Sequence, residues 1–127
     1  MPWDASDGAG FTSPRVRPWL PVGDVAACNV AGQSRDPDSA LSLCRRLIAM
    51  RHAEFGGRAA DYKPLPSAED SWSYRVGGIT VLANFSDERL PATPPAGDVL
   101  LASYGKEPAA DDDLVLEPWQ GLVYRTS

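Results

Sequence analysis

The sequence predicts an α+β fold, in which a long loop and one amphipathic helix precede an antiparallel β-sheet or sandwich. Apolar side chains recur at three- and four-residue spacing in residues 36–57, which is the period of an amphipathic helix. From about residue 58, short runs alternate between apolar and polar residues, with glycine and proline turns between them, as in antiparallel strands. We therefore expect two parts, residues 1–57 and 58–127.

Composition narrows the class of protein. The chain has 127 residues, a hydrophobic share of 43% and a net charge of −5. The length predicts one domain, or one small domain with an attached piece. The acidic balance argues against nucleic acid and anionic membranes as partners. No apolar run approaches the roughly 20 residues that span a bilayer, and no signal peptide is visible. Cys28 and Cys44 are isolated, which favours a reduced, cytoplasmic setting.

Residues 1–35 are predicted to form a long ordered loop. They are rich in glycine, proline, aspartate and serine and show little periodicity. A loop of this length in a compact domain is usually functional or disordered. Trp3, Phe11 and Trp19 argue against disorder, because disordered segments are depleted in aromatic residues. We expect the loop to pack against another surface, with Trp19 as a packing anchor.

The helix is predicted to begin at Asp36, whose carboxylate can accept a hydrogen bond from a free N–H of the first turn. Pro37 suits the first helical position, and Gly56 and Gly57 supply the stop. The apolar stripe consists of Ala40, Leu43, Cys44, Leu47, Ile48 and Met50. A stripe this wide needs a large partner surface. The helix and the aromatic loop therefore both predict a partner outside this chain.

The β region is predicted to contain several short strands. They lie at residues 59–65, 72–76, 79–85, 99–104, 114–117 and 122–125. Gly77 and Gly78 form a two-residue hairpin signal, and the proline-rich residues 90–97 predict an edge strand or loop. Trp72 and Phe85 each share one strand face with other apolar residues at two-residue spacing, so we expect both in the core. Trp119 is expected to be a turn residue.

Seven segments then recur in the order of a known family. They are MPWD, GAGFT, PWLPV and NVAGQSRDPDSALSLCRRLIAMR, followed by VLANFSDE, LLASYG and LEPWQGLVYR. This series resembles the C-terminal part of the family 13 glycoside hydrolases, in the branch of the α-glucosidases, oligo-1,6-glucosidases and trehalose synthases. MPWD alone is weakly specific, whereas the ordered series is specific and covers essentially the whole chain.

The resemblance implies how the two parts arose. Residues 1–35 would be the loop after the last strand of a (β/α)8 barrel, and residues 36–55 would be the last barrel helix. Residues 58–127 would be the C-terminal β domain. The helix stripe would then pack against the missing barrel portion, and the loop would lie at the barrel face where active sites occur. Cys44 departs from the family, which usually has an aromatic residue before the basic pair.

The resemblance also implies that this chain holds no catalytic residue. The family's aspartate nucleophile, its glutamate acid/base and its second aspartate all lie upstream of this loop. Trp3 and Asp4 resemble loop positions near the substrate entrance of the intact enzyme, and they are the candidate substrate-proximal residues. The implied substrates are short α-linked glucosides such as maltose or isomaltose.

Other candidate residues favour ordinary structural roles. Retaining glycoside hydrolysis needs two carboxyl groups about 5–5.5 Å apart, whereas Asp70 and the run from Asp111 to Asp113 are typical of solvated turns. That run lacks the alternating ligands and the glycine of a calcium loop. The single histidine, His52, lies at the helix end. We therefore expect no cofactor and no metal.

The leading hypothesis is the non-catalytic C-terminal portion of an α-glucosidase-like glycoside hydrolase that acts in carbohydrate metabolism. One alternative is a stand-alone module that binds carbohydrate through exposed tryptophan or tyrosine. Another alternative is a protein-interaction module whose helix docks to a separately encoded barrel portion. The first alternative requires a sugar-binding surface on the β domain, and the second requires an uncovered helix.

Overall fold

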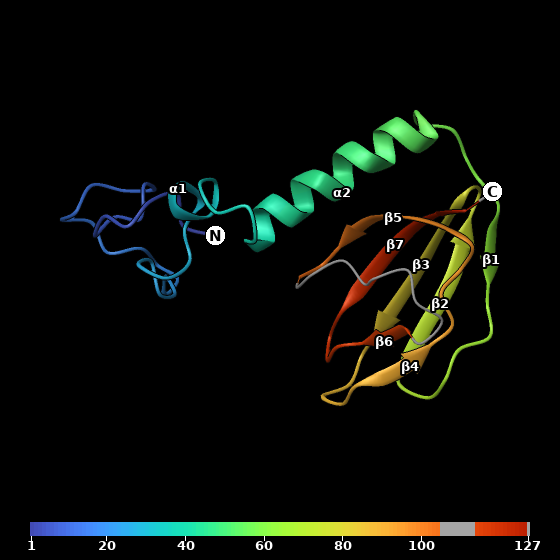
Figure 1. Cartoon of the computed structure of the whole chain (residues 1–127). Coiled ribbons are helices and arrows are strands. Elements are labelled where there is room, and N and C mark those ends of the chain that lie inside the picture. The colour runs from blue at the N-terminus through green and yellow to red at the C-terminus, as the bar shows by residue number, and fades with distance from the viewer. Residues whose placement is uncertain (105–113, 127) are drawn as a thin grey trace. The chain divides into compact units, whose positions relative to one another are not determined.

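The computed structural model describes residues 1–104 and 114–126. It contains two helices and seven strands in that part of the chain (Figure 1). Their bounds are α1 Val30–Gln33, α2 Ala40–Phe55, β1 Tyr62–Pro64, β2 Ser71–Val76, β3 Ile79–Asn84, β4 Leu90–Ala92, β5 Gly97–Ala102, β6 Leu114–Leu116 and β7 Gly121–Thr126. The predicted α+β class is confirmed. The chain divides into two compact units, Met1–Glu54 and Phe55–Ser127.

The first unit begins with an irregular loop that hydrogen bonds connect to α1. The N–H groups of Val30 and Ala31 donate to the carbonyl oxygens of Pro2 and Trp3, at 2.9 and 3.0 Å. The opening segment therefore lies beside the start of α1, a contact that no pattern in the sequence predicts. Asn29, whose side chain caps α1, is the signal for that short helix.

The prediction that Asp36 caps α2 is wrong. Its carboxylate accepts the N–H of Asp38 at 2.9 Å and so closes a turn before the helix. Ser39 is the cap, because its hydroxyl accepts the N–H of Ser42 at 3.2 Å and its carbonyl accepts the N–H of Leu43 at 2.9 Å. Short polar side chains often bind nearby backbone groups in this way, which offers the chain an alternative to the helix.

The apolar stripe of α2 is incompletely covered by the described residues. The helix contains no buried residue. Leu43, Leu47 and Met50 are half-buried, and Ile48 is exposed. In the loop, Trp19 is almost completely exposed, so it anchors no packing among the described residues, contrary to expectation.

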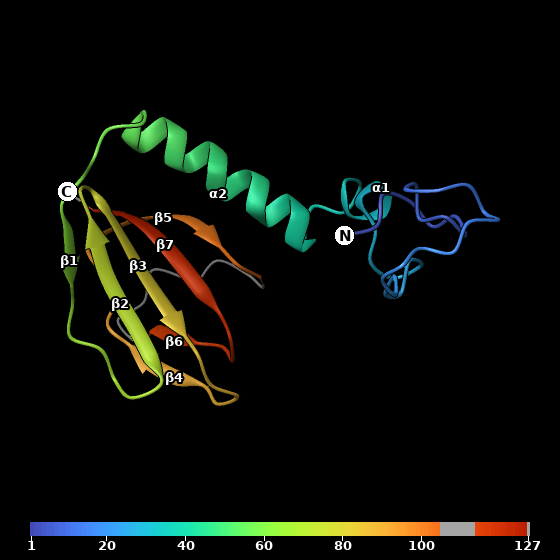
Figure 2. The ribbon, with the colours of Figure 1, turned by 180° about the vertical axis from the view of Figure 1, so that it is seen from behind.

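The second unit consists of two antiparallel sheets (Figures 1 and 2). The larger has the strand order β1-β2-β3-β7-β5, and the smaller pairs β4 with β6. The hairpin predicted at Gly77 and Gly78 is confirmed, since Val76 pairs with Ile79 across a two-residue loop. Gly77 has a φ of 55°, a conformation in which glycine carries no steric penalty. The proline-rich segment contributes β4, at the edge of the smaller sheet.

The core of the second unit is built from both sheets. It contains Leu82, Ala102, Leu114, Leu116, Leu122 and Tyr124. Trp72 is 47% exposed and Phe85 is 52% exposed, so the expectation that both lie in the core is wrong. The buried side of β3 toward the smaller sheet carries Thr80, Leu82 and Asn84 instead. Because Thr80 and Asn84 are polar, the sequence pattern of β3 did not identify this side as the core face.

Candidate functional site

Trp3 and Asp4 lie in the opening loop of the first unit. The Trp3 ring meets Phe11 edge-on, with ring centroids 6.5 Å apart, and the side chain remains 57% exposed. Gly10 has a φ of 72°, and a Cβ there would lie 2.6 Å from the Trp3 Cβ. A larger residue at Gly10 would therefore be strained and would displace Trp3. Trp3, Gly10 and Phe11 lie close together in the sequence, and the fold leaves the Trp3 indole accessible.

Asp4 is held as a carboxylate by its own turn. Its Oδ1 accepts the N–H of Ser6 at 2.9 Å and also the Ser6 hydroxyl. Hydrogen bonds from the Ser6 hydroxyl and N–H hold the pKa of Asp4 below its usual value. A general acid in glycoside hydrolysis needs a raised pKa. Asp4 is therefore suited to accept hydrogen bonds from a ligand and unsuited to donate a proton.

The other candidate groups do not assemble into a reactive or metal-binding centre within residues 1–104 and 114–126. No group of three or more His, Cys, Asp or Glu side chains in those ranges could hold a metal ion. His52 is exposed in the last turn of α2, and Asp70 is exposed before β2. The aspartate run 111–113 lies outside the described residues. No described helix is long and apolar enough to cross a membrane.

A cleft of about 960 Å³ lies within the second unit. Leucine, proline, alanine, valine, serine and threonine residues line it, from the 65–73 segment, β3, the strands of the smaller sheet and residues 93–95. None of the described lining residues is charged. Glycoside hydrolysis by the common mechanisms needs a pair of carboxyl groups, so these lining residues do not supply that chemistry.

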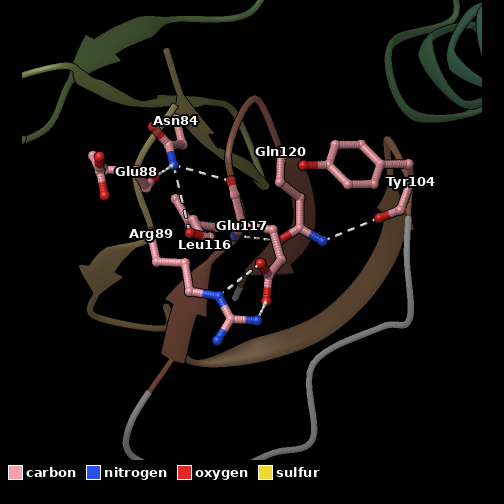
Figure 3. A network of polar contacts seen from close by, with 7 residues as sticks. All are labelled: Asn84, Glu88, Arg89, Tyr104, Leu116, Glu117 and Gln120. Carbon is pink, nitrogen blue, oxygen red and sulfur yellow. Dashed lines mark hydrogen bonds and ion pairs between the residues drawn. The ribbon is translucent and has the colours of Figure 1, made fainter. Parts of the chain in front are cut away.

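A buried polar network connects two loops of the second unit (Figure 3). Asn84 is 2% exposed, and its Nδ2 donates to the carbonyl oxygens of Glu88 at 2.7 Å and Glu117 at 2.9 Å. Its Oδ1 accepts the N–H of Ser86 at 2.9 Å. The amide thus links the loop after β3 to the turn before β7. In the sequence, this asparagine is recognisable only as part of a polar strand end.

The same two loops carry an exposed cluster that sequence reasoning also missed. Arg89 donates two hydrogen bonds to the Glu117 carboxylate, Nε at 2.9 Å and Nη2 at 2.6 Å. The indole N–H of Trp119 donates to Asp87 at 2.8 Å, while the Trp119 side chain stays 57% exposed. Trp119 does lie in a turn, as expected. Its exposure and its bond to Asp87 depend on a loop more than 30 residues away in sequence.

Comparison with a family model identifies the β region. Residues 57–123 match the model described as Domain of unknown function (DUF3459). Among curated proteins, the chain is 31% identical to the α-glucosidase MAL12 of Saccharomyces cerevisiae, over 98% of this chain and 23% of that protein. It is 30% identical to an oligo-1,6-glucosidase of Parageobacillus thermoglucosidasius, over 98% of this chain and 24% of that protein. The chain thus spans about a quarter of the length of these relatives.

Solved structures give the same picture. The trehalulose synthase MutB from Pseudomonas mesoacidophila MX-45 superposes with a TM-score of 0.82 at 31% identity, over 98% of this chain and 24% of that one. A MutB variant has been solved in complex with its substrate sucrose. The trehalose-6-phosphate hydrolase of Bacillus licheniformis shares the fold, with a TM-score of 0.80 at 24% identity, over 98% of this chain and 24% of that one.

Proposed function

The chain belongs to the family 13 glycoside hydrolases, whose C-terminal DUF3459 domain matches its residues 57–123, and we propose that it is the non-catalytic C-terminal portion of an α-glucosidase-like enzyme. In this proposal residues 1–57 are the last barrel loop and helix, and residues 58–127 are the C-terminal β domain. The complete enzyme acts on short α-linked glucosides in the cytoplasm.

One observation carries the proposal: relatives match 98% of this chain along only 23–24% of their own length. The chemistry of the described residues also supports a non-catalytic role. The uncharged cleft offers no carboxyl pair among its described lining residues, and Asp4 has a lowered pKa. A retaining glycosidase needs a nucleophilic carboxylate and a second carboxyl group as acid and base.

The partner of this portion is the rest of the barrel. α2 presents Leu43, Leu47 and Met50 half-covered, which suits a helix that completes its packing on other barrel elements. The β domain presents further apolar surface on β1 and β2. There the ring of Tyr74 lies 5.6 Å from that of Tyr62 and 4.9 Å from that of Trp72. Exposed aromatic groups of this kind are common at protein interfaces.

In the complete enzyme, we propose that Trp3 and Asp4 lie near the substrate entrance. The accessible Trp3 indole offers an apolar face to a sugar ring. The ionised Asp4 retains acceptor positions for sugar hydroxyl groups beyond those that Ser6 occupies. Both side chains would position substrate and neither would transfer a proton.

The first test is hydrolysis by the purified chain. We expect no glucose release from maltose, isomaltose or a chromogenic α-glucoside above the rate in buffer. Turnover that disappears in Asp4→Asn would overturn the non-catalytic assignment.

A second test uses a family enzyme that has been shortened to end just before its MPWD-like segment. It asks whether this chain restores the glycosidase activity of that shortened enzyme. Restoration by the wild-type chain is expected, with a raised KM for Trp3→Ala and Asp4→Asn. Arg17→Ala, in an exposed part of the same loop, is the matched control and should restore normal KM. If the wild-type chain and all three variants gave the same KM, the proposal that Trp3 and Asp4 lie near the substrate entrance would be wrong.

A further inference from the structure

The backbone at Trp119 adopts a conformation that tryptophan rarely takes. The turn is closed by the N–H of Gln120, which donates to the carbonyl of Glu117 at 3.1 Å. Pro118 occupies the second position and Trp119 the third, with a φ of 58°. Because proline holds its own φ near −65°, this is the type II arrangement, in which the third position favours glycine or asparagine. A bulky residue there is strained, and such strain clusters at ligand-binding sites.

The Trp119 side chain is fixed in place without being buried. Its indole N–H donates to Asp87 at 2.8 Å, and its backbone N–H donates to the carbonyl of Ser86 at 3.2 Å. More than half of the side chain nevertheless remains in contact with solvent. Burial therefore does not explain why a tryptophan occupies a position suited to glycine. The fixed orientation of an accessible ring explains it.

The base of this ring is rigid. Asn84 connects the carbonyl oxygens of Glu88, in the loop after β3, and Glu117, in the turn before β7 (Figure 3). Gln120 adds a second link, since its side chain accepts the N–H of Glu117 at 3.0 Å and donates to the carbonyl of Tyr104 at 3.0 Å. A ligand that meets a pre-ordered surface loses less conformational entropy on binding.

The surroundings of the ring define the class of ligand. Asp87 lies against the indole N–H, and the Arg89–Glu117 pair is exposed on the same two loops. An exposed aromatic face beside planar hydrogen-bonding groups suits a ligand with a C–H face and hydroxyl edges, which is a sugar ring. Asp87, Glu88 and Glu117 contribute three negative charges against the one positive charge of Arg89. This excess of negative charge disfavours phosphorylated sugars through like-charge repulsion.

We propose that Trp119 and Asp87 form a second, non-catalytic site that binds a neutral oligosaccharide on the β domain. The glucose-based class of that oligosaccharide rests on the proposed function, whereas the site itself does not. Sugar stacks on the Trp119 ring, and its hydroxyl groups bond to the carboxylates of Asp87 and Glu117 and to the guanidinium of Arg89.

The experiment is an NMR titration of the full chain with maltotriose, which follows the four indole N–H signals. The Trp119 signal is assigned by its loss in Trp119→Gly. We expect maltotriose to shift that signal and glucose 6-phosphate to leave it unchanged. Trp119→Gly removes the ring and relieves the backbone, so its unfolding temperature should equal or exceed that of wild type while the sugar response is lost.

Asp70→Gly is the matched control, because Asp70 has a φ of 59° and carries no ring. It should keep the sugar response. A wild-type Trp119 signal that maltotriose does not move would overturn the proposal. So would a Trp119→Gly variant that unfolds at clearly lower temperature, since the tryptophan would then be a structural clamp. Glucose release by the chain would refute the proposed function and leave this binding result unaffected.

Discussion

At the scale of single residues, Asn84 is a buried polar side chain that joins two loops of the second unit. It is almost completely buried and connects two loops by donating to the backbone carbonyl oxygens of Glu88 and Glu117. Removing one partner of a buried hydrogen bond leaves the other unsatisfied, at about 1–3 kcal/mol for each group. Asn84 is therefore a stronger determinant of stability than the exposed Arg89–Glu117 ion pair.

We expect Asn84→Ala to lower the free energy of unfolding by about 3 kcal/mol, because two carbonyl oxygens lose their donor. Urea denaturation of the full chain measures this. Ser86→Ala removes a hydroxyl that donates to Asn84 at 2.8 Å and accepts the N–H of Glu88 at 3.3 Å, and it should lower that free energy by about 1 kcal/mol. Equal effects of the two substitutions would contradict a central role for the amide.

Tyr124 makes stability depend on pH at the alkaline end. Its burial raises the pKa of the phenol above the usual value. In the unfolded chain the phenol ionises near pH 10. Above that pH the unfolded state binds fewer protons than the folded state, so the free energy of unfolding falls as pH rises. We expect Tyr124→Phe to lose stability less steeply than wild type above about pH 10. Parallel pH profiles of the two proteins would refute the assignment.

At the scale of elements, α2 is less buried than its apolar stripe predicts. Leu43, Leu47 and Met50 follow helical spacing, yet none is buried. Contiguous apolar surface that is left exposed marks an interface or promotes aggregation. We therefore expect that covering this helix decides whether the chain stays in solution.

We expect the isolated chain to associate at high concentration through this helix, and Leu47→Asp to reduce the association. Sedimentation velocity measures the effect. Ala49→Asp is the control, because Ala49 is exposed on the same helix and outside the stripe. A monomeric wild-type chain, together with a Leu47→Asp variant that unfolds, would show that the stripe is buried within this chain.

At the scale of the whole molecule, the second unit holds its core within itself. The six buried core residues come from β3, β5, β6 and β7, and none comes from the loop or α2. The first unit has few buried residues, namely Gly8, Ala9, Asn29 and Ser39. We therefore predict that residues 58–127 supply most of the stability of this chain, although a domain of that size is only marginally stable.

Hydrogen exchange of the full chain tests that prediction. Amides of β3 and β7, which pair with each other at the centre of the larger sheet, should exchange slowly, and those of residues 1–28 quickly. Deleting residues 1–35 should leave the protection of β3 and β7 unchanged. Equal protection in the opening loop would show that the chain unfolds as one cooperative unit.

Local patterns predicted most of the secondary structure and the family. The helix, the hairpin at Gly77 and Gly78, and the other strands follow from periodicity and turn chemistry, which act between residues close in sequence. The resemblance of the ordered segments predicted the family. The candidate site was predicted only as the positions Trp3 and Asp4, because their accessibility and the lowered pKa of Asp4 require coordinates.

The tertiary structure decided which face of each strand is core. Thr80 and Asn84 are polar and yet buried, because their hydrogen-bond partners come from elsewhere in the chain: Thr126 lies on the neighbouring strand β7 and Glu117 on another loop. Phe85 and Trp72 are apolar and yet exposed, because the smaller sheet packs on the opposite face. Likewise, Trp119 is recognisable as a turn residue from its neighbours, but its pairing with Asp87 depends on a contact across 32 residues. Such long-range contacts leave no periodic trace in one sequence, since either alternating face satisfies the same strand pattern.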